Sequence, residues 1–184
     1  MKAILKLLIL VVTVVTVSAG AVDAQRFAGG ARPSDSRSLD AQIFHQIMKL
    51  PNYGLFDDIK YEVQGGTVIL SGSVASLGTK RDAASVVKRI PGVQRVVNNI
   101  RELPPSSFDN QIRRALVRQI ANSPGLYRYL QGPNPSVRLI VDNGHVALEG
   151  YVSSRSDAST MNILANGIPG VFSVENHLML TREQ

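Results

Sequence analysis

The sequence predicts an α+β protein of two tandem αββαβ units, each a small three-stranded sheet with two helices packed on one face. The first observation is a repeat. Gly66–Glu102 and Gly144–Leu180 align at a constant offset of 78 residues, with twelve of 37 positions identical. The second is the apolar pattern, in which each copy has the order helix, strand, strand, helix, strand. The third is size: about 65 residues and three strands per copy form a core only if both helices cover one sheet face.

Residues 1–24 have the pattern of a secretory signal peptide. Two lysines precede an apolar run, and Ala24 ends a cleavage motif, with Gly20 as the alternative end. The run is too short to span a bilayer. We therefore predict an exported, periplasmic protein with a cleaved signal. Residues 25–38, rich in Gly, Ala, Ser and Arg, are predicted to be a flexible tail.

The chain contains no cysteine. It therefore cannot form disulfides or be lipidated at a cysteine after the signal, so each unit must be held together by its apolar core. The net charge is +6, and removal of residues 1–24 leaves 18 basic and 13 acidic residues, or +5. This mild positive charge fits attraction to anionic head groups or polyanions without identifying a partner.

Repeat one is predicted over residues 39–103. It opens with apolar residues at helical spacing and this helix ends at Pro51. A Gly65-Gly66 pair between two strand patterns is typical of a hairpin. A helix with outward lysines and arginines follows, then a last strand. We place these strands, helix and last strand at residues 59–64, 67–74, 79–90 and 93–100.

Repeat two is predicted over residues 108–181, after a short linker at 104–107. Its first helix carries an apolar stripe, its strands form a hairpin, and nine extra residues lie within 122–136. The stripe is Phe108, Ile112, Leu116 and Ile120, and the later elements are predicted at 138–141, 145–152, a helix through Met161, Leu164 and Ile168, and 171–180.

Glycines and prolines recur at equivalent places and are interpreted as structural. Those in the hairpins supply turn conformations with positive φ, and those inside strands mark a bulge or a close approach of the helix backbone. No lysine follows them as in a phosphate-binding loop. The structural set is Gly66, Gly72, Pro91, Gly92, Gly144, Gly150, Pro169 and Gly170, with Gly65 beside the first hairpin glycine.

Two motifs occur twice and resemble the BON domain. Gly-x-Val-x-Leu-x-Gly-x-Val lies at 66–74 and 144–152, and Pro-Gly-Val-x-x-Val-x-Asn lies at 91–98 and 169–176. A tandem pair behind a signal peptide is similar in layout to the OsmY-like periplasmic family. The resemblance implies a non-enzymatic, transport-associated module that binds phospholipid surfaces or envelope proteins, with a role in envelope stress protection. Lipoproteins of the family carry a lipidated cysteine, which this chain lacks, so its membrane contact would be reversible.

No residue pattern predicts a catalytic, cofactor or metal site. His45, His145 and His177 lie on different elements without the clustering that metal ligands need. The Asp57-Asp58 pair fits the opening of a strand better than acid–base chemistry. No Gly-x-Ser-x-Gly elbow is present. We therefore predict that the protein is not an enzyme.

The start of repeat two is the one asymmetric feature. Between Asp109 and Asp142 the chain has basic residues but no acidic ones, with tyrosines among them. Arginines bind lipid phosphates, and tyrosine rings lie at the depth of the head groups. Each basic residue near the membrane contributes about 1 kcal/mol to the free energy of binding to anionic lipid. We predict a lipid-binding edge of Arg113, Arg114, Arg118, Tyr127, Arg128 and Tyr129. The alternative is that the arginines form a solvated helix face and Tyr127 and Tyr129 pack between the repeats.

The partner class also has alternatives. Besides an anionic phospholipid surface, the open sheet edge of each repeat suits pairing with envelope proteins, as in an assembly module. Nucleic acid is not expected, because the chain has no Gly-x-x-Gly loop between helices and no aromatic stacking platform. The lipid type, the protein partner and the oligomeric state are left open by the sequence.

Overall fold

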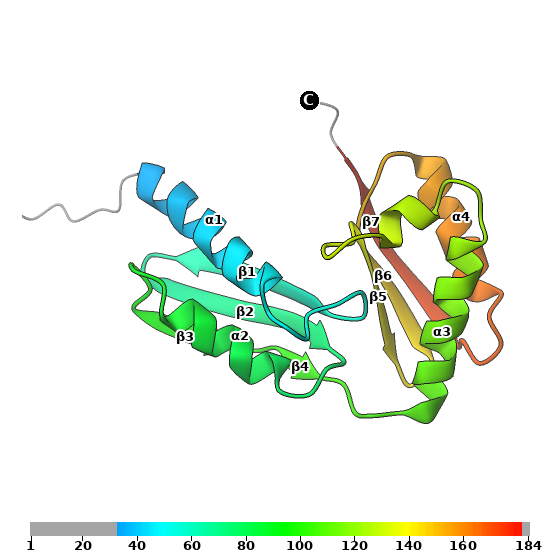
Figure 1. Ribbon diagram of the computed structural model, residues 1–184, viewed down its shortest axis with the longest axis horizontal. Coiled ribbons are helices and arrows are strands. Elements are labelled where there is room, and N and C mark those ends of the chain that lie inside the picture. The colour runs from blue at the N-terminus through cyan, green and yellow to red at the C-terminus, as the bar shows by residue number, and fades with distance from the viewer. Residues whose placement is uncertain (1–32, 182–184) are drawn as a thin grey trace, which may run out of the picture. The chain divides into compact units, whose positions relative to one another are not determined.

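The computed structural model describes residues 33–181 and their side chains from residue 39 onward (Figure 1). The predicted signal peptide and residues 25–32 lie outside the described residues. The elements in chain order are α1 Pro33–Met48, β1 Asp58–Gln64, β2 Thr67–Val74, α2 Thr79–Lys88, β3 Arg95–Asn98, β4 Arg101–Glu102, α3 Ser107–Ala121, the 3₁₀ helix η1 Tyr127–Leu130, β5 Val137–Asp142, β6 His145–Val152, α4 Arg155–Asn166 and β7 Ser173–Leu180. Two tandem αββαβ units are therefore present, as predicted.

The first helix starts earlier than the sequence analysis predicts. Residues 33–38 were assigned to the flexible tail, but α1 begins at Pro33. Proline is favoured at the first helical position, where its missing N–H has no helical partner to lose. The predicted tail is therefore wrong over its last six residues.

The sheet of repeat one is built on a two-residue hairpin. β1 and β2 pair antiparallel from Asp58↔Ser73 to Gln64↔Thr67, and β2 pairs in parallel with β3 and β4. The predicted last strand is therefore interrupted between β3 and β4, at two residues, Asn99 and Ile100. Consecutive asparagines at 98–99 suit a strand poorly, whereas repeat two has Asn176-His177 in an unbroken β7.

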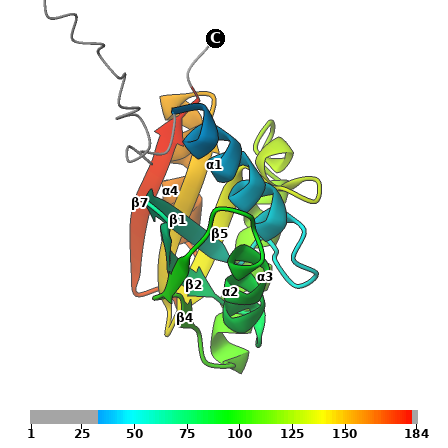
Figure 2. The same ribbon diagram turned by 90° about the vertical axis from the view of Figure 1, so that its left-hand side faces the viewer.

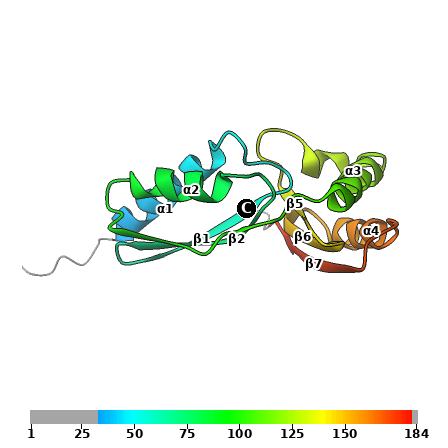
Figure 3. The same cartoon turned by 90° about the horizontal axis from the view of Figure 1, so that it is seen from below.

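The sheet of repeat two has the order β5-β6-β7, with the same antiparallel hairpin and parallel third strand. Figure 2 shows β7, in red, at the edge of this sheet. In each repeat both helices lie on one face of the sheet (Figure 3). The nine-residue insertion contains η1.

The strand glycines fit a close backbone contact, but the partner differs from the prediction. Gly72 and Gly150 have φ of 104° and 113°. A Cβ would lie 2.2 Å from the Asp58 carbonyl oxygen at Gly72, and 2.1 Å from the Ser136 carbonyl oxygen at Gly150. The backbone that approaches therefore belongs to the start of the neighbouring strand, β1 at Gly72 and the residue just before β5 at Gly150, and not to a helix.

The hairpin glycines also differ from one another. Gly65 and Gly144 have positive φ, as predicted, but Gly66 does not. In repeat two the second positive φ belongs to Asn143, at 50°. A Cβ at Gly66 would instead meet the Gln94 side chain at 2.6 Å. The exposed, flexible Gln94 side chain can move away, so this contact does not by itself require glycine, and the positive-φ prediction is wrong at Gly66.

Each repeat has its own hydrophobic core. The core of repeat one includes Ile43, Leu70 and Val87, and that of repeat two includes Leu116, Leu148 and other residues of α3, α4 and the sheet. The motif asparagines tie the last strand to the second helix: Asn98 donates to the Lys80 carbonyl at 2.8 Å, and Asn176 to the Ala158 carbonyl at 3.1 Å. The repeated asparagine therefore has a structural role in both units.

The loop before β1 also contributes to repeat two. Leu55 and Phe56 pack against the core of repeat two, and the Leu139 N–H donates to the Leu55 carbonyl at 2.9 Å. The described residues accordingly fall within one compact unit.

Candidate functional site

The start of α3 is fixed by two polar side chains. The Ser106 hydroxyl caps the helix by accepting from the Asp109 N–H at 3.1 Å. The Asp109 carboxylate, 1% exposed, accepts from the N–H groups of Asn143 at 3.0 Å and Gly144 at 2.9 Å. Because these bonds join α3 to the β5–β6 hairpin, they decide which face of the helix is turned outward.

Arg113 lies on the inner side of this helix and is only 6% exposed. Its guanidinium donates to the Val141 carbonyl at 2.6 Å and to the Asn110 side chain at 2.8 Å. Burial lowers the pKa of Arg113, and the nearby Asp109 carboxylate opposes that shift. These contacts give Arg113 a structural role inside repeat two, because they engage the guanidinium that a phosphate would need.

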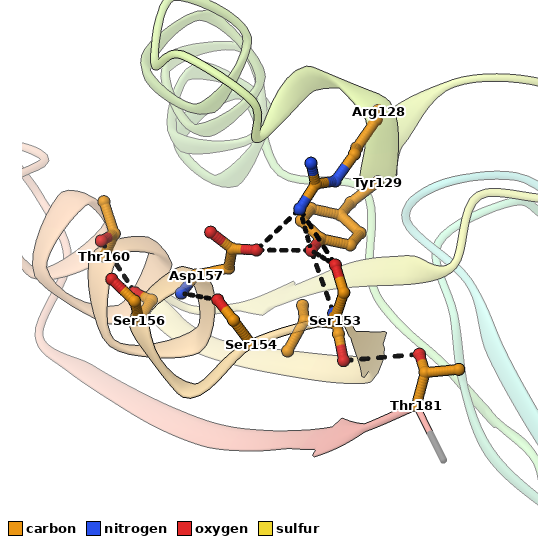
Figure 4. Close-up of polar contacts among 9 residues, drawn as sticks. Arg128, Tyr129, Ser153, Ser154, Ser156, Asp157, Thr160 and Thr181 are labelled. Carbon is orange, nitrogen blue, oxygen red and sulfur yellow. Dashed lines mark hydrogen bonds and ion pairs between the residues drawn. The ribbon is translucent and has the colours of Figure 1, made fainter. Parts of the chain in front are cut away.

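Arg128 and Tyr129 belong to a polar network in the insertion (Figure 4). The Tyr129 hydroxyl accepts from the Ser153 N–H at 3.0 Å and donates to the Asp157 carboxylate. Arg128 donates to the same carboxylate at 2.9 Å and stacks on the Tyr129 ring, 4.7 Å from its centroid. The Tyr129 hydrogen bond, with help from Ser154 and Arg128, lowers the pKa of Asp157.

Tyr129 is 6% exposed and packs in the core of repeat two. The alternative that placed Tyr129 between the repeats is therefore wrong for this residue. Tyr127, on the same 3₁₀ helix, is 51% exposed.

At the equivalent turn of repeat one, a different side chain accepts the hydrogen bond from the backbone N–H. Ala75 aligns with Ser153, and its N–H donates to the Asp57 carboxylate at 2.7 Å. The same carboxylate accepts from the Gly54 N–H at 2.9 Å and is 1% exposed as a residue. The insertion in repeat two therefore supplies an acceptor that Asp57 supplies in repeat one, which explains much of the sequence asymmetry.

Two of the predicted arginines remain exposed on α3. Arg114 and Arg118 make no ion pair among the described residues. Together with Phe108 and Gln111 they follow a spacing of three to four residues, which places side chains on one helix face. We call this exposed row of Phe108, Gln111, Arg114 and Arg118 the α3 stripe.

The first member of the stripe was expected in the core. Phe108 is 42% exposed, because the next residue, Asp109, occupies the inward position beside the hairpin. Its ring centroid lies 6.2 Å from that of Phe172, which is 71% exposed. Phe172 was not among the residues predicted from the sequence. Its alignment with the polar Gln94 of repeat one could have indicated that Phe172 is exposed.

Exposed large apolar residues are concentrated in repeat two. Of nine such residues in the described part of the chain, seven belong to repeat two: Phe108, Tyr127, Tyr151, Ile163, Phe172, Met179 and Leu180. The other two are Phe44 and Leu77. The surface of repeat two is thus the more apolar one, and the α3 stripe lies on it.

Within residues 33–181 none of the helices has the length and apolar content that crossing a bilayer requires. The same residues contain no group of three or more histidine and acidic side chains arranged to bind a metal ion.

Comparison with known proteins identifies the repeated unit. The family model of the BON domain matches residues 48–104 and again residues 108–182. The C-terminal domain of CdsD, a structural protein of the type III secretion system of Chlamydia trachomatis, aligns over 78% of this chain and 98% of its own, with 15% identity and a TM-score of 0.32. A second CdsD structure aligns over 78% of this chain and 92% of its own, with 15% identity and a TM-score of 0.28. The two family matches cover most of the chain, which therefore belongs to the BON domain family as a tandem pair.

Proposed function

We propose that this protein is a non-enzymatic envelope protein that binds anionic phospholipid surfaces through the outward face of repeat two. The binding surface consists of the α3 stripe and Phe172. The observation that carries the proposal is the exposed Phe108–Phe172 pair, with ring centroids 6.2 Å apart. It lies at the start of a helix whose two exposed arginines form no ion pair within residues 39–181.

This pairing of groups suits a membrane interface. Aromatic rings enter the boundary between head groups and acyl chains, while arginines on the same helix meet the phosphates. A solvent-exposed phenylalanine pair is otherwise unfavourable, because its apolar area contacts water. BON domains are associated with phospholipid binding and with envelope proteins, which supports the same reading.

The proposed surface contains only part of the lipid-binding edge that was predicted from the sequence. Arg114, Arg118 and Tyr127 remain exposed. Arg113, Arg128 and Tyr129 are engaged in bonds within repeat two. Phe108 and Phe172 supply the apolar contact that the sequence prediction assigned to tyrosines.

Co-flotation of the purified protein with vesicles tests the proposal. We expect binding to phosphatidylglycerol-containing vesicles and not to phosphatidylcholine vesicles, with loss at high salt because the contacts are exposed. Each arginine contributes about 1 kcal/mol, so Arg114→Gln/Arg118→Gln should weaken binding roughly thirtyfold. The control is Lys49→Gln/Arg155→Gln, which removes the same charge from exposed positions outside the surface. Equal losses in the two variants would overturn the assignment.

Export is part of the same proposal. The N-terminal pattern and the family both support a periplasmic location after cleavage of residues 1–24. N-terminal sequencing of the protein from the periplasmic fraction should find Gln25 as the first residue. Recovery of the chain with its first 24 residues intact would contradict cleavage.

A further inference from the structure

A basic groove lies on the surface of repeat one, between α2 and β3. Its volume is about 610 Å³. Lys80, Arg81 and Lys88 line it from α2, and Arg95 lines it from β3. The acidic residue in its lining, Glu102, accepts a hydrogen bond from the Gly78 N–H at 3.1 Å. The groove is therefore strongly positive.

Most of these cations have no internal partner. Within the described residues Lys80, Lys88 and Arg95 form no ion pair. Arg81 pairs with Asp82 at 3.2 Å, but its side chain is 81% exposed, so the pair is weak. The groove thus presents charge that the fold of repeat one does not use.

The floor of the groove includes a free strand edge. Among the strands of residues 33–181, β3 pairs with β2 alone, and the N–H groups of Arg95 and Asn99 donate to the Gly66 and Leu70 carbonyls. Because alternate residues of a strand point their backbone groups in opposite directions, the N–H and C=O groups of Val96 and Asn98 face away from β2. Both residues line the groove.

Repeat two shows that the charge is not a requirement of the fold. At the positions equivalent to Lys80, Arg81, Lys88 and Arg95, repeat two has Ala158, Ser159, Asn166 and Ser173. The same backbone therefore forms without any of the four cations.

We propose that the α2–β3 groove binds an acidic polypeptide segment in extended conformation. The segment adds a strand to the free edge of β3 and places its carboxylates against the cations that line the groove. This inference goes beyond lipid binding, which we assign to repeat two.

The geometry favours a polypeptide over a membrane surface. The Val96 and Asn98 edge offers donors and acceptors in alternation, and a peptide backbone provides both kinds of partner. Phosphate oxygens only accept. A groove between a helix and a strand also admits a linear chain along its length, whereas a bilayer is flat and meets only the rims.

Fluorescence anisotropy with a labelled peptide of five Glu-Thr repeats tests the proposal on the full protein. The key variant is Lys88→Asn/Arg95→Ser, which installs the residues of repeat two. We expect it to weaken peptide binding about tenfold, from the loss of two partly exposed charge pairs. Lys49→Gln/Arg155→Gln, the matched control, should bind as the wild type does. Circular dichroism checks that both variants fold.

Two further probes separate the alternatives. The same peptide with alternate backbone nitrogens methylated should bind at least about tenfold more weakly, because it cannot donate to the strand edge. A peptide of five Lys-Thr repeats should not bind. If Lys88→Asn/Arg95→Ser and the control variant lose the same peptide affinity, the groove is not the binding site. If the methylated peptide binds as tightly as the unmethylated one, the segment does not add a strand to β3.

The same variants also test two alternative roles of the groove, membrane binding and protection against self-association. If phosphatidylglycerol vesicles require Lys88 and Arg95 while the peptide does not bind, the groove contacts lipid and the proposal is wrong. If Lys88→Asn/Arg95→Ser only promotes self-association in sedimentation, the cations protect an edge strand. The dependence of vesicle binding on Arg114 and Arg118 tests only the lipid surface of repeat two. The lipid proposal and the peptide proposal can therefore fail independently of each other.

Discussion

The two repeats have the same backbone and different surfaces. In both, the first strands form a two-residue hairpin, the third strand runs parallel to the second, and an asparagine ties it to the second helix. At the outward positions, Lys88 and Gln94 of repeat one align with Asn166 and Phe172 of repeat two. Residues required by backbone geometry recur, whereas residues facing water have diverged. The divergent positions are therefore where different binding roles are expected.

The repeats also differ in which group accepts a hydrogen bond from one backbone N–H at the end of the second strand. The N–H groups of Ala75 and Ser153 leave the second strand at equivalent places, and each needs an acceptor. Asp57 provides it in repeat one, and Tyr129 provides it in repeat two together with Asp157 and Arg128. The fold demands a buried acceptor at this turn but does not specify which residue supplies it.

The largest effect is expected where the repeats agree. Gly72→Ala and Gly150→Ala should each lower the free energy of unfolding by about 3 kcal/mol or more, because a Cβ overlaps a neighbouring carbonyl and the residue has positive φ. Urea unfolding measures the loss. Gly132→Ala is the control, since Gly132 has φ of 84° but open space around its Cβ, so only conformational strain of about 1 kcal/mol applies. A similar loss at all three glycines would contradict the close strand contact.

The next effect concerns the two ways of holding the turn. Asp57→Ala should destabilise the protein by about 2–3 kcal/mol, because the Gly54 and Ala75 N–H groups lose a buried acceptor. Tyr129→Phe should cost about 1–2 kcal/mol, because one backbone N–H loses its partner and Arg128 still pairs with Asp157. Hydrogen exchange at the Ala75 and Ser153 amides localises each loss. Faster exchange of both amides in either variant would show that the two turns are not independent.

Low pH should remove a stabilising interaction from repeat two that repeat one does not have. The pKa of Asp157 lies below its usual 3.8 in the folded protein, so its stabilising contribution is fully present above that value. It is lost as the pH falls through the lowered pKa. The equivalent residue of repeat one, Thr79, does not titrate. In urea unfolding we expect wild type to exceed Asp157→Asn by less than about 1 kcal/mol at pH 6, since the Arg128 pair is largely exposed. The difference should shrink near pH 3, and a constant difference would argue against the linkage.

The sequence predicted the fold well because the fold is set by repeated, local patterns. The hairpins and the order of helices and strands follow from apolar spacing and from turn residues, and the structure has them. The start of α1 at Pro33 and the break in the last strand of repeat one were missed, since both depend on weak local preferences near element ends.

The candidate site was harder to predict, because charge and tyrosine content do not reveal partners. Arg113, Arg128 and Tyr129 look like surface residues in the sequence, but Val141, Ser153 and Asp157 lie next to them in space. These partners are 24 to 29 residues away along the chain. Comparing the aligned repeats position by position is more informative than composition, because Phe172 stands where repeat one has the polar Gln94.

The smallest effect on stability, and the most informative one for function, is expected from exchanging Gln94 and Phe172. Both side chains lie over a hairpin glycine, Gly66 in repeat one and Gly144 in repeat two. Phe172→Gln should change the free energy of unfolding by no more than about 0.5 kcal/mol, because the side chain is 71% exposed. Flotation with phosphatidylglycerol vesicles should nevertheless weaken by about tenfold, since an interfacial ring is lost. Gln94→Phe alone should not create binding, because the residue of α1 that aligns with Phe108 is Leu39, which packs against the core of repeat one. Retained flotation of Phe172→Gln would assign membrane contact to the arginines alone and remove the aromatic pair from the site.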